Sequence, residues 1–341
     1  MILDIAAVVA LAFVLSAWLT SRVRRFALSK GMLDVPNARS SHHSVTPRGG
    51  GLAIVLATTV AWLILAYRGE IPSHLLIALV GGGAGVALIG FLDDRRPVPA
   101  RVRFTVHLAA ALWALAWIGA PGLLSMGAHV IPLGWAGWLL AILGIAWFLN
   151  LFNFMDGIDG IAASEAVFMT CAGAALTLLG GMSTGVMAVG FPLAASCCGF
   201  LLLNWPPAKI FMGDVGSGYL GYVIAVMALA ATRDSPSAAW VWLILGGAFV
   251  VDATVTLIRR AARGERVAEA HRSHAYQWLA RRWASHKKVT IGMLAIDILW
   301  LLPCAYVATL HPRLSPWMVL IALAPLAILV FLAGAGRREA D

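Results

Sequence analysis

The chain has 341 residues, of which 61% are hydrophobic and only 12% are charged, with a net charge of +9. Soluble domains carry about 25% charged residues, so this sequence cannot build an ordinary water-exposed surface. The composition also excludes intrinsic disorder, collagen and coiled coil, and the four cysteines lie in apolar runs that do not suggest a disulfide framework. The sequence therefore predicts an integral membrane protein.

A transmembrane helix needs about 20 predominantly apolar residues. Largely uncharged runs of about that length occur at residues 3–20, 50–67, 74–92, 104–120, 131–149, 161–180, 183–203, 216–232, 236–258, 289–309 and 315–334. We therefore predict an all-α integral membrane protein with about eleven transmembrane helices. No composition shift divides the chain, so a single polytopic domain is expected over residues 1–341.

The basic residues predict the orientation. Loops on one side of the eleven runs hold 22 of the 25 lysines and arginines, and the opposite loops hold only Arg68, Arg233 and Arg313. Such a bias places the basic loops in the cytoplasm, with the N-terminus outside and the C-terminus inside. The long loops are then cytoplasmic, so an active site is expected on that face. This topology and contact with membrane lipids explain the positive charge, and no nucleic-acid partner is expected.

Carboxylates are costly at a membrane edge and indicate function there. Asp93 and Asp94 end the run 74–92. By themselves they are also compatible with a solvated helix end, because two arginines follow them.

A second polar cluster follows the run 131–149. It contains Asn150, Asn153, Asp156 and Asp159 at a spacing of three residues, and it has no lysine or arginine to neutralise the two acids. Unpaired acids at this position require a cation, and oxygen ligands suit Mg²⁺.

A third cluster lies between the runs 183–203 and 216–232. Asn204 and Lys209 precede a glycine-rich segment with Gly213, Asp214 and Ser217. Backbone N–H groups at a helix start bind phosphate oxygens, and a lysine adds positive charge. The five acids of the three clusters are expected to converge on one pocket that holds a metal-bound phosphate.

A fourth feature is the basic loop before the run 289–309, which contains His271, Arg272 and His274. We interpret these residues as a polar ligand contact and not as a zinc site, because two histidines are too few. Asp252, near the inner end of the preceding run, either joins the pocket or pairs with an arginine. Asp297 is expected well inside the bilayer, and the sequence assigns it no role.

The motifs together resemble the polyprenyl-phosphate N-acetylhexosamine-1-phosphate transferases of glycosyltransferase family 4, which include the peptidoglycan phospho-MurNAc-pentapeptide translocase. The matching segments are residues 34–42, 46–51, 93–94, 150–160 and 211–217. The segment 271–277, with the sequence HRSHAYQ, is similar to the branch that begins O-antigen glycans.

The resemblance implies transfer of N-acetylglucosamine 1-phosphate, or of an N-acetylated 6-deoxyhexose 1-phosphate, from a UDP-sugar to undecaprenyl phosphate. This reaction releases UMP and is the first membrane step of O-antigen or cell-envelope glycan synthesis, in the bacterial inner membrane. The implied cofactor is Mg²⁺, with Mn²⁺ as an alternative, and the implied metal ligands are Asp214 with Asp93 or Asp94.

The same resemblance implies a role for each polar cluster. The catalytic acids are expected to be Asp93, Asp94, Asp156, Asp159 and Asp214. The substrate-binding residues are expected to be Asn150, Asn153, Asn204, Gly213 and Ser217 around the nucleotide and its phosphates, Lys209, His271, Arg272 and His274 at the diphosphate and sugar, and Arg39 and Arg48 at the lipid phosphate.

Direct attack of the lipid phosphate is favoured over an aspartyl-phosphate intermediate, because a phosphate monoester is mostly dianionic at pH 7 and gains little from a base. Two other classes stay open as alternatives, a secondary transporter and a membrane protein that only binds the lipid carrier. A homodimer also stays open.

Overall fold

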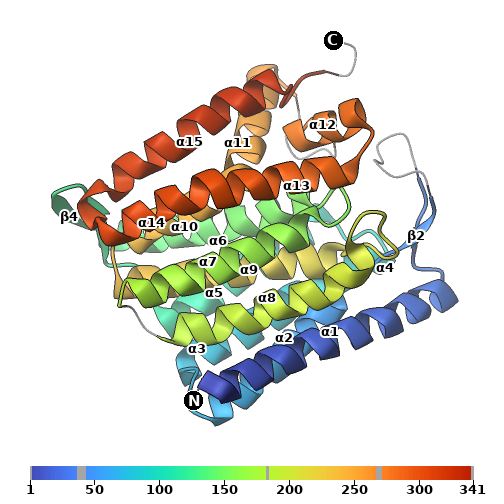
Figure 1. The fold of residues 1–341 in the computed structure, drawn as a ribbon, viewed down its shortest axis with the longest axis horizontal. Coiled ribbons are helices and arrows are strands. Elements are labelled where there is room, and N and C mark those ends of the chain that lie inside the picture. Colours follow the sequence, from blue (N-terminus) through green and yellow to red (C-terminus); the bar gives the residue numbers. More distant parts are fainter. Residues whose placement is uncertain (1, 37–43, 182–183, 266–270, 339–341) are drawn as a thin grey trace.

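The computed structural model describes residues 2–36, 44–181, 184–265 and 271–338 and shows a bundle of long helices (Figure 1). In chain order the helices are α1 (Ile2–Lys30), α2 (Gly51–Tyr67), α3 (Ser73–Ile77), α4 (Gly83–Arg95), α5 (Ala100–Ile118), α6 (Trp135–Met155), α7 (Ile161–Leu179), α8 (Thr184–Asn204), α9 (Asp214–Asp234), α10 (Ala238–Leu245), α11 (Gly247–Ala262), α12 (Ala275–Trp283), α13 (His286–Ile296), α14 (Leu302–Leu310) and α15 (Ser315–Leu332). The π-helical turns η1 (Ala78–Gly82) and η2 (Asp297–Leu301) join α3 to α4 and α13 to α14, and the 3₁₀ turn η3 (Pro312–Leu314) precedes α15.

Two short antiparallel hairpins lie at opposite ends of the bundle (Figure 1). Strands β1 (Leu33–Asp34) and β2 (Thr46–Pro47) form one of them, and strands β3 (Leu123–Met126) and β4 (His129–Pro132) form the other. The hairpins add little to a structure that is otherwise helical.

The predicted fold class is confirmed, because each of the eleven apolar runs coincides with a helix or with a helix interrupted by a π turn or a bend. Within the described residues, eight helices are long and apolar enough to cross a membrane, or nine if the bent pair α10–α11 counts as one span. Helix α2 has only 17 residues, and α5 is not among the eight. The number of eleven spans and the orientation therefore stay predictions.

The predicted span 236–258 is not one straight helix, because α10 and α11 meet at an angle of 75°. Two glycines stand at this bend. A Cβ atom at Gly247 would lie 2.6 Å from a methyl carbon of Leu323 and 3.1 Å from one of Leu301. A side chain at this position would displace these leucines, and the bend directs α11 toward α12 and α15 (Figure 1).

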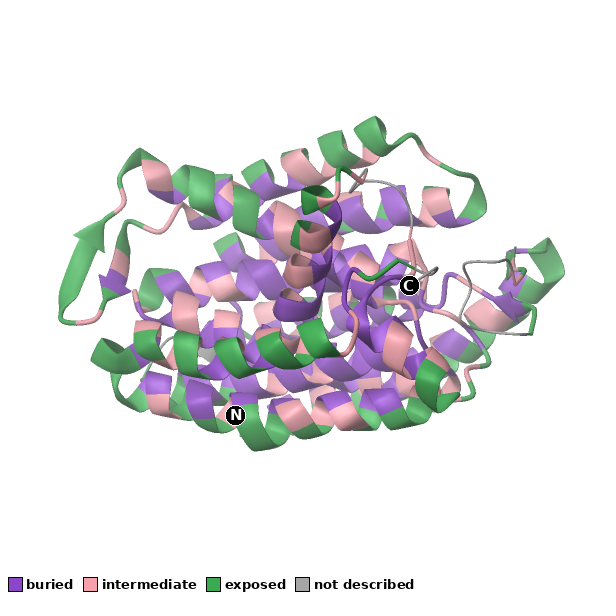
Figure 2. Ribbon diagram, turned by 90° about the horizontal axis from the view of Figure 1, so that it is seen from above, coloured by how far each residue is buried: buried purple, intermediate pink, exposed green. Residues whose placement is uncertain are grey.

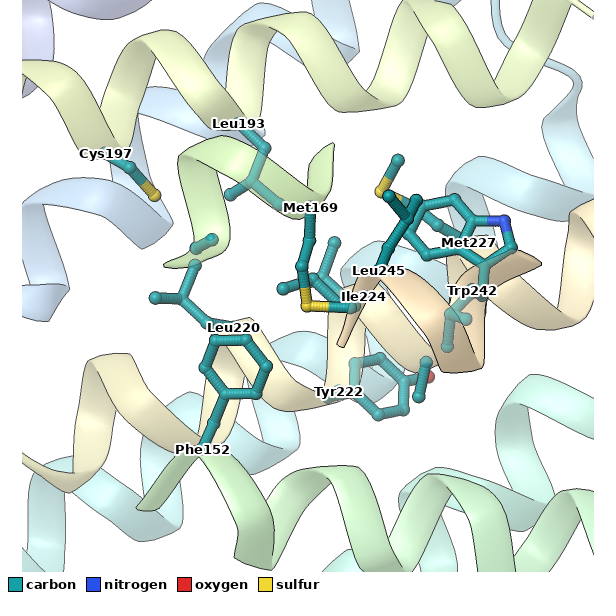
Figure 3. Packing of buried hydrophobic residues seen from close by; sticks show 14 of the residues in the cluster. Phe152, Met169, Leu193, Cys197, Leu220, Tyr222, Ile224, Met227, Trp242 and Leu245 are labelled. Carbon is teal, nitrogen blue, oxygen red and sulfur yellow. The ribbon is translucent and has the colours of Figure 1, made fainter. Parts of the chain in front are cut away.

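The apolar core lies where α6, α7, α8, α9 and α10 meet. Phe152, Met169, Leu193, Leu220 and Trp242 come from these five helices and pack against one another there (Figure 3). Exposed residues lie mainly on the outer faces of the peripheral helices (Figure 2). The core therefore fixes α9 at the centre of the bundle.

Close backbone contacts between helices set the position of the site. A Cβ atom at Gly51 would lie 2.2 Å from the Cα atom of Gly216, which brings the starts of α2 and α9 together. A Cβ atom at Gly90 of α4 would lie 2.4 Å from the carbonyl oxygen of Asp214. Small residues permit such approaches in membrane bundles. They hold the ends of α2, α4 and α9 at the end of the bundle that carries the β1–β2 hairpin.

Asp297, to which no role was assigned from the sequence, begins the π turn η2 and is fully buried. Its neighbour is Glu165 of α7, which is also fully buried. These two acids line neither of the polar pockets described below.

Candidate functional site

The three acid-bearing clusters converge, but only four of the five acids predicted to share one pocket line it, because Asp93 is not among the lining residues. The clusters meet at one end of the bundle around a pocket of about 230 Å³. The pocket is lined by Asp34, Arg48, Asp94, Asn153, Asp156, Gly157, Ile158, Asp159, Asn204, Phe211, Met212, Gly213, Asp214, Ser217 and Gln277. We call it the acidic pocket, because five of its fifteen lining residues are aspartates.

Asp94 joins α4 to the start of α9. Its two carboxylate oxygens accept hydrogen bonds from the backbone N–H groups of Asp214 (3.0 Å) and Val215 (3.2 Å), and the side chain is only 2% exposed. A carboxylate is stabilised at this place because the first N–H groups of a helix lack helical partners. Because it is buried against these N–H groups, Asp94 has the contacts of an anchor for α9, not those of an accessible metal ligand.

Gly213 makes this anchor sterically possible. Its φ angle is +75°, and a Cβ atom there would lie 2.4 Å from a carboxylate oxygen of Asp94. Arg48 completes the joint, because its guanidinium donates to the backbone carbonyl oxygens of Asp93 (3.1 Å) and Asp94 (2.6 Å). These are carbonyl groups at the end of α4 that lack helical partners.

Asp93 and Asp214 lie on either side of one guanidinium. Arg103 of α5 donates from Nη1 to Asp93 Oδ2 at 2.7 Å and to Asp214 Oδ2 at 3.3 Å. Asn153 donates to the other oxygen of Asp214 at 2.9 Å and lies 3.2 Å from Ser217 Oγ. The two carboxylates thus form an oriented pair that shares a positive charge.

The loop after α6 holds the remaining two acids. Asp159 accepts a hydrogen bond from the backbone of Ala208 at 3.0 Å and pairs with His286 at 3.3 Å. Asn204 connects the loop to the glycine-rich segment, because it accepts from the backbone of Gly160 (3.1 Å) and donates to that of Ile210 (2.9 Å).

Asp156 lines the acidic pocket, and no hydrogen bond to its side chain is seen within the described residues. Burial raises the pKa of Asp156 well above its ordinary value, and the nearby carboxylates of Asp214, Asp94 and Asp159 raise it further. A bound cation would oppose this effect by favouring the ionised form. The pocket is therefore suited to a positively charged ligand or a metal ion.

A second pocket of about 800 Å³ adjoins the first and shares Asp159 and Phe211 with it. Its lining includes four basic side chains, those of Arg272, Arg281, His286 and Lys287. We call it the basic pocket. An anion that extends from the acidic pocket would meet positive charge here.

The segment 271–277, which we call the histidine loop, leads into α12. Its predicted ligand His274 is buried and pairs with Asp252 at 3.3 Å. Asp252 also accepts hydrogen bonds from the backbone N–H groups of Ala275 and Tyr276, both at 2.9 Å. Of the two roles left open for Asp252, neither is observed, because it caps α12 and holds His274.

Several predicted residues lie away from the two pockets. The rings of His271 and His274 contact each other at a tilt of 30°, with centres 4.9 Å apart, but neither lines a polar pocket. Asn150 donates to the carbonyl oxygen of Ala146 in its own helix, and the side chain of Lys209 is exposed outside both pockets. Arg39 lies outside the described residues.

The structure also adds residues that the sequence did not indicate. Arg103 is the most central of them, because it lies ten residues beyond Asp93 on another helix and belongs to no recognisable motif. The only sequence feature that could have indicated Arg103 is its position at the start of the predicted span 104–120, shortly after the acidic pair Asp93 and Asp94. Gln277, Arg281, His286 and Lys287 likewise reach the pockets only through the packing of α12 and α13.

The side chains of the site can be tested for their ability to coordinate the predicted Mg²⁺. No cluster of three histidine, cysteine, aspartate or glutamate residues suited to a metal occurs in the part of the chain that the structure describes. Asp214 lines the acidic pocket with a side chain that is 33% exposed, and it fits Mg²⁺, which commonly takes one or two carboxylates and completes its shell with water and substrate phosphates. Asp93 does not line that pocket, and its two oxygens accept hydrogen bonds from the backbone of Val98 and from Arg103.

Comparison with known proteins gives a consistent result. The model of glycosyl transferase family 4 matches residues 76–232. The chain is 29% identical over 325 residues to a probable undecaprenyl-phosphate N-acetylglucosaminyl 1-phosphate transferase of Bacillus subtilis. The matched region covers 93% of this chain and 88% of that protein. It is 31% identical over 229 residues to the phospho-N-acetylmuramoyl-pentapeptide-transferase of Moorella thermoacetica (63% and 69%). Identity to the undecaprenyl-phosphate alpha-N-acetylglucosaminyl 1-phosphate transferase of Yersinia pestis is 27% over 328 residues (90% and 85%).

Proposed function

Because the chain belongs to glycosyl transferase family 4, we propose that it transfers an N-acetylhexosamine 1-phosphate from a UDP-sugar to undecaprenyl phosphate. The protein is a multi-pass protein of the bacterial inner membrane. The products are undecaprenyl-diphospho-sugar and UMP. The donor is UDP-N-acetylglucosamine or a UDP-linked N-acetylated 6-deoxyhexose, and the product begins an O-antigen or a related envelope glycan.

The observation that carries this proposal is the acidic pocket joined to the basic pocket. A UDP-sugar and a lipid phosphate are both anions, so their mutual repulsion is a large part of the barrier to reaction. The basic pocket supplies Arg272, Arg281 and Lys287 for the negative charge of the donor. The acidic pocket supplies oriented carboxylates that hold a cation beside the reacting phosphates.

Mg²⁺ is the proposed cofactor, and Asp214 would hold it. When bound, it would neutralise the diphosphate oxygens and the negative charge that develops on departing UMP. Asp94 and Asp93 are not kept as ligands in this proposal, because Asp94 is buried against the backbone of α9 and Asp93 does not line the acidic pocket.

The proposed chemistry is a direct displacement. An oxygen of the lipid phosphate forms a bond to the β-phosphorus of the donor, and the bond from that phosphorus to the oxygen bridging the α-phosphorus breaks. The electron pair leaves with UMP. Arg48 lines the acidic pocket and is the proposed partner of the lipid phosphate, while Asn153 keeps Asp214 oriented.

A label-exchange experiment tests the proposal. Detergent-purified protein is incubated with UDP-N-acetylglucosamine, undecaprenyl phosphate, Mg²⁺ and labelled UMP. A transferase moves label into the UDP-sugar by reversing the reaction, and a sample without undecaprenyl phosphate is the control. A panel of UDP-sugars then identifies the donor. If folded wild-type protein moved no label from UMP into any UDP-sugar of the panel, the proposed function would be contradicted.

A further inference from the structure

After α15 the chain folds back onto the histidine loop and α11. After α15 ends at Leu332, two glycines adopt positive φ angles, +98° at Gly334 and +68° at Gly336. They turn the chain toward α11 and α12, and Figure 1 shows this end of the chain close to both helices. We call residues 334–338 the C-terminal strap.

The strap is bound to the histidine loop through its backbone. The N–H group of Gly336 donates to the carbonyl oxygen of Ser273 at 2.6 Å. The carbonyl oxygens of the strap are held in turn by α11 and the residue after it: Arg259 donates to that of Ala335, and Arg263 donates to that of Gly336. The strap therefore links the histidine loop to α11.

A charged group reinforces this link. Glu265 accepts hydrogen bonds from Arg260 and Arg263, both at 2.9 Å, and from Arg338 of the strap at 3.4 Å. These arginines lower the pKa of Glu265 to about 2, so it is a carboxylate at neutral pH. Because it contacts arginines from both segments, it connects the strap to the end of α11.

The histidine loop in turn contacts the acidic pocket. The hydroxyl of Tyr276 donates to the carbonyl oxygen of Phe154 at 2.9 Å. A Cβ atom at Gly157 would lie 2.2 Å from that hydroxyl and 3.0 Å from the side-chain nitrogen of Gln277. The first turn of α12 therefore rests directly on the loop that carries Asp156. A shift of Ser273 would move Arg272 and this first turn relative to both pockets.

We propose that the C-terminal strap is a positioning element that holds the histidine loop in the place required for donor binding. This inference rests on the proposed function, since it assigns the donor to the two pockets. The strap touches no lining residue of the acidic pocket by a hydrogen bond observed here, so it acts through Ser273 and α12. Its loss should weaken donor binding more than it slows turnover.

Gly336 allows a test with a single added carbon atom. A Cβ atom there would lie 2.9 Å from Cβ of Arg259 and 3.0 Å from the carbonyl oxygen of Thr256, so Gly336→Ala must push the strap away from α11. Gly181 is a matched control, because it has the same φ of +68° but no atom within 4 Å of the position of a Cβ. Both variants carry the same backbone strain, and only Gly336→Ala adds a clash.

The first measurement is steady-state kinetics of the full-length protein. Gly336→Ala should raise the KM for UDP-N-acetylglucosamine about tenfold while kcat and the KM for undecaprenyl phosphate change less than about twofold. Gly181→Ala should leave all three within about twofold. A roughly tenfold fall in kcat of Gly336→Ala with an unchanged KM for the UDP-sugar would overturn the inference.

The second measurement does not depend on activity. Hydrogen exchange of the amides in residues 272–277 should be at least about tenfold faster in Gly336→Ala than in Gly181→Ala, while exchange in α9 stays the same. If the wild type turns over no UDP-sugar, the proposed function fails, and this comparison still decides whether the strap holds the loop. Unchanged hydrogen exchange in residues 272–277 would overturn the proposed positioning role of the strap.

Glu265→Gln provides a second variant if Gly336→Ala does not fold. It keeps the shape of the side chain but removes the charge that attracts three arginines. The donor KM should rise about threefold, and Glu265→Asp should recover part of the loss. No change in donor KM for Glu265→Gln would count against the strap.

Discussion

The acidic pocket and the histidine loop differ in how the protein holds them. Asp94 and Asp214 of the pocket come from the ends of α4 and α9, whose backbones lie so close that a Cβ atom at Gly90 would clash with Asp214. The histidine loop depends on side-chain caps and on a strap, with Asp252 and Gly336 as its main attachments.

This difference suggests a division of labour. Groups that act on the reacting atoms must be placed accurately, and a misplacement of about 1 Å can cost 10²-fold in rate. Substrate-binding groups tolerate more freedom and are often found on loops. We therefore expect changes in the acidic pocket to lower kcat and changes in the histidine loop to raise KM.

The largest effect is expected for Asp214→Asn. The substitution keeps the size of the side chain but removes the charge proposed to hold Mg²⁺. Turnover should fall by at least about 10³-fold, which corresponds to roughly 4 kcal/mol of lost transition-state stabilisation. The variant should still elute like the wild type from a sizing column, because the change opens no cavity.

Asp234→Asn is the matched control for this variant, because Asp234 ends the same helix that Asp214 begins. Its turnover should stay within about twofold of the wild type. Near-normal turnover of Asp214→Asn would remove the metal ligand from the proposed mechanism and with it the assignment of catalysis to the acidic pocket.

The second prediction breaks the helix contact and leaves every polar group in place. Gly90→Ala places a methyl group 2.4 Å from the carbonyl oxygen of Asp214 and must separate α4 from α9. We expect destabilisation by about 1–3 kcal/mol and a fall in kcat of about 10²-fold. Gly85→Ala, on the same helix with open space around it, should change neither. Thermal unfolding measures the loss of stability, and activity assays measure the fall in kcat. Equal stability and equal kcat in the two variants would refute the claim that the close contact between α4 and α9 positions the catalytic groups.

The third prediction concerns the basic pocket. Arg272→Ala should raise the KM for the UDP-sugar about tenfold with little change in kcat, because a charge-assisted hydrogen bond contributes about 1.5–3 kcal/mol. Arg282→Ala removes the same charge from the neighbouring helix but from outside this pocket, so its KM should be normal. A collapse of kcat in Arg272→Ala would show that the loop takes part in the chemical step.

The smallest effect is expected from pH. Burial, together with the neighbouring His274 and Arg260, lowers the pKa of His271 from its ordinary value to about 3. Below pH 6.5 the unfolded chain therefore binds a proton that the folded chain does not, and stability falls as the pH decreases. His271→Gln should lose less stability than the wild type between pH 7 and pH 5, by about 1–2 °C in Tm. Identical losses would mean that His271 does not titrate as its burial implies.

The sequence was informative where function depends on local pattern. The spacing in 150–160 and the glycines around Asp214 predicted a shared pocket at one end of the bundle, and that pocket is confirmed. The same pattern could not separate Asp93 from Asp94, which are adjacent in sequence. One pairs with Arg103 and the other with the backbone of α9, because successive residues of a helix point in different directions.

The sequence by itself determined that the chain is helical and apolar, and which polar residues end each helix, because hydrophobic length and glycine position act locally along the chain. Tertiary structure alone decided that Arg103 joins two acids, that Asp252 caps α12 and that the end of the chain reaches Ser273. Each of these contacts joins residues from separate elements. Their side chains meet only after the helices have packed, and packing depends on the fit of many surfaces at once, which no single segment of sequence records.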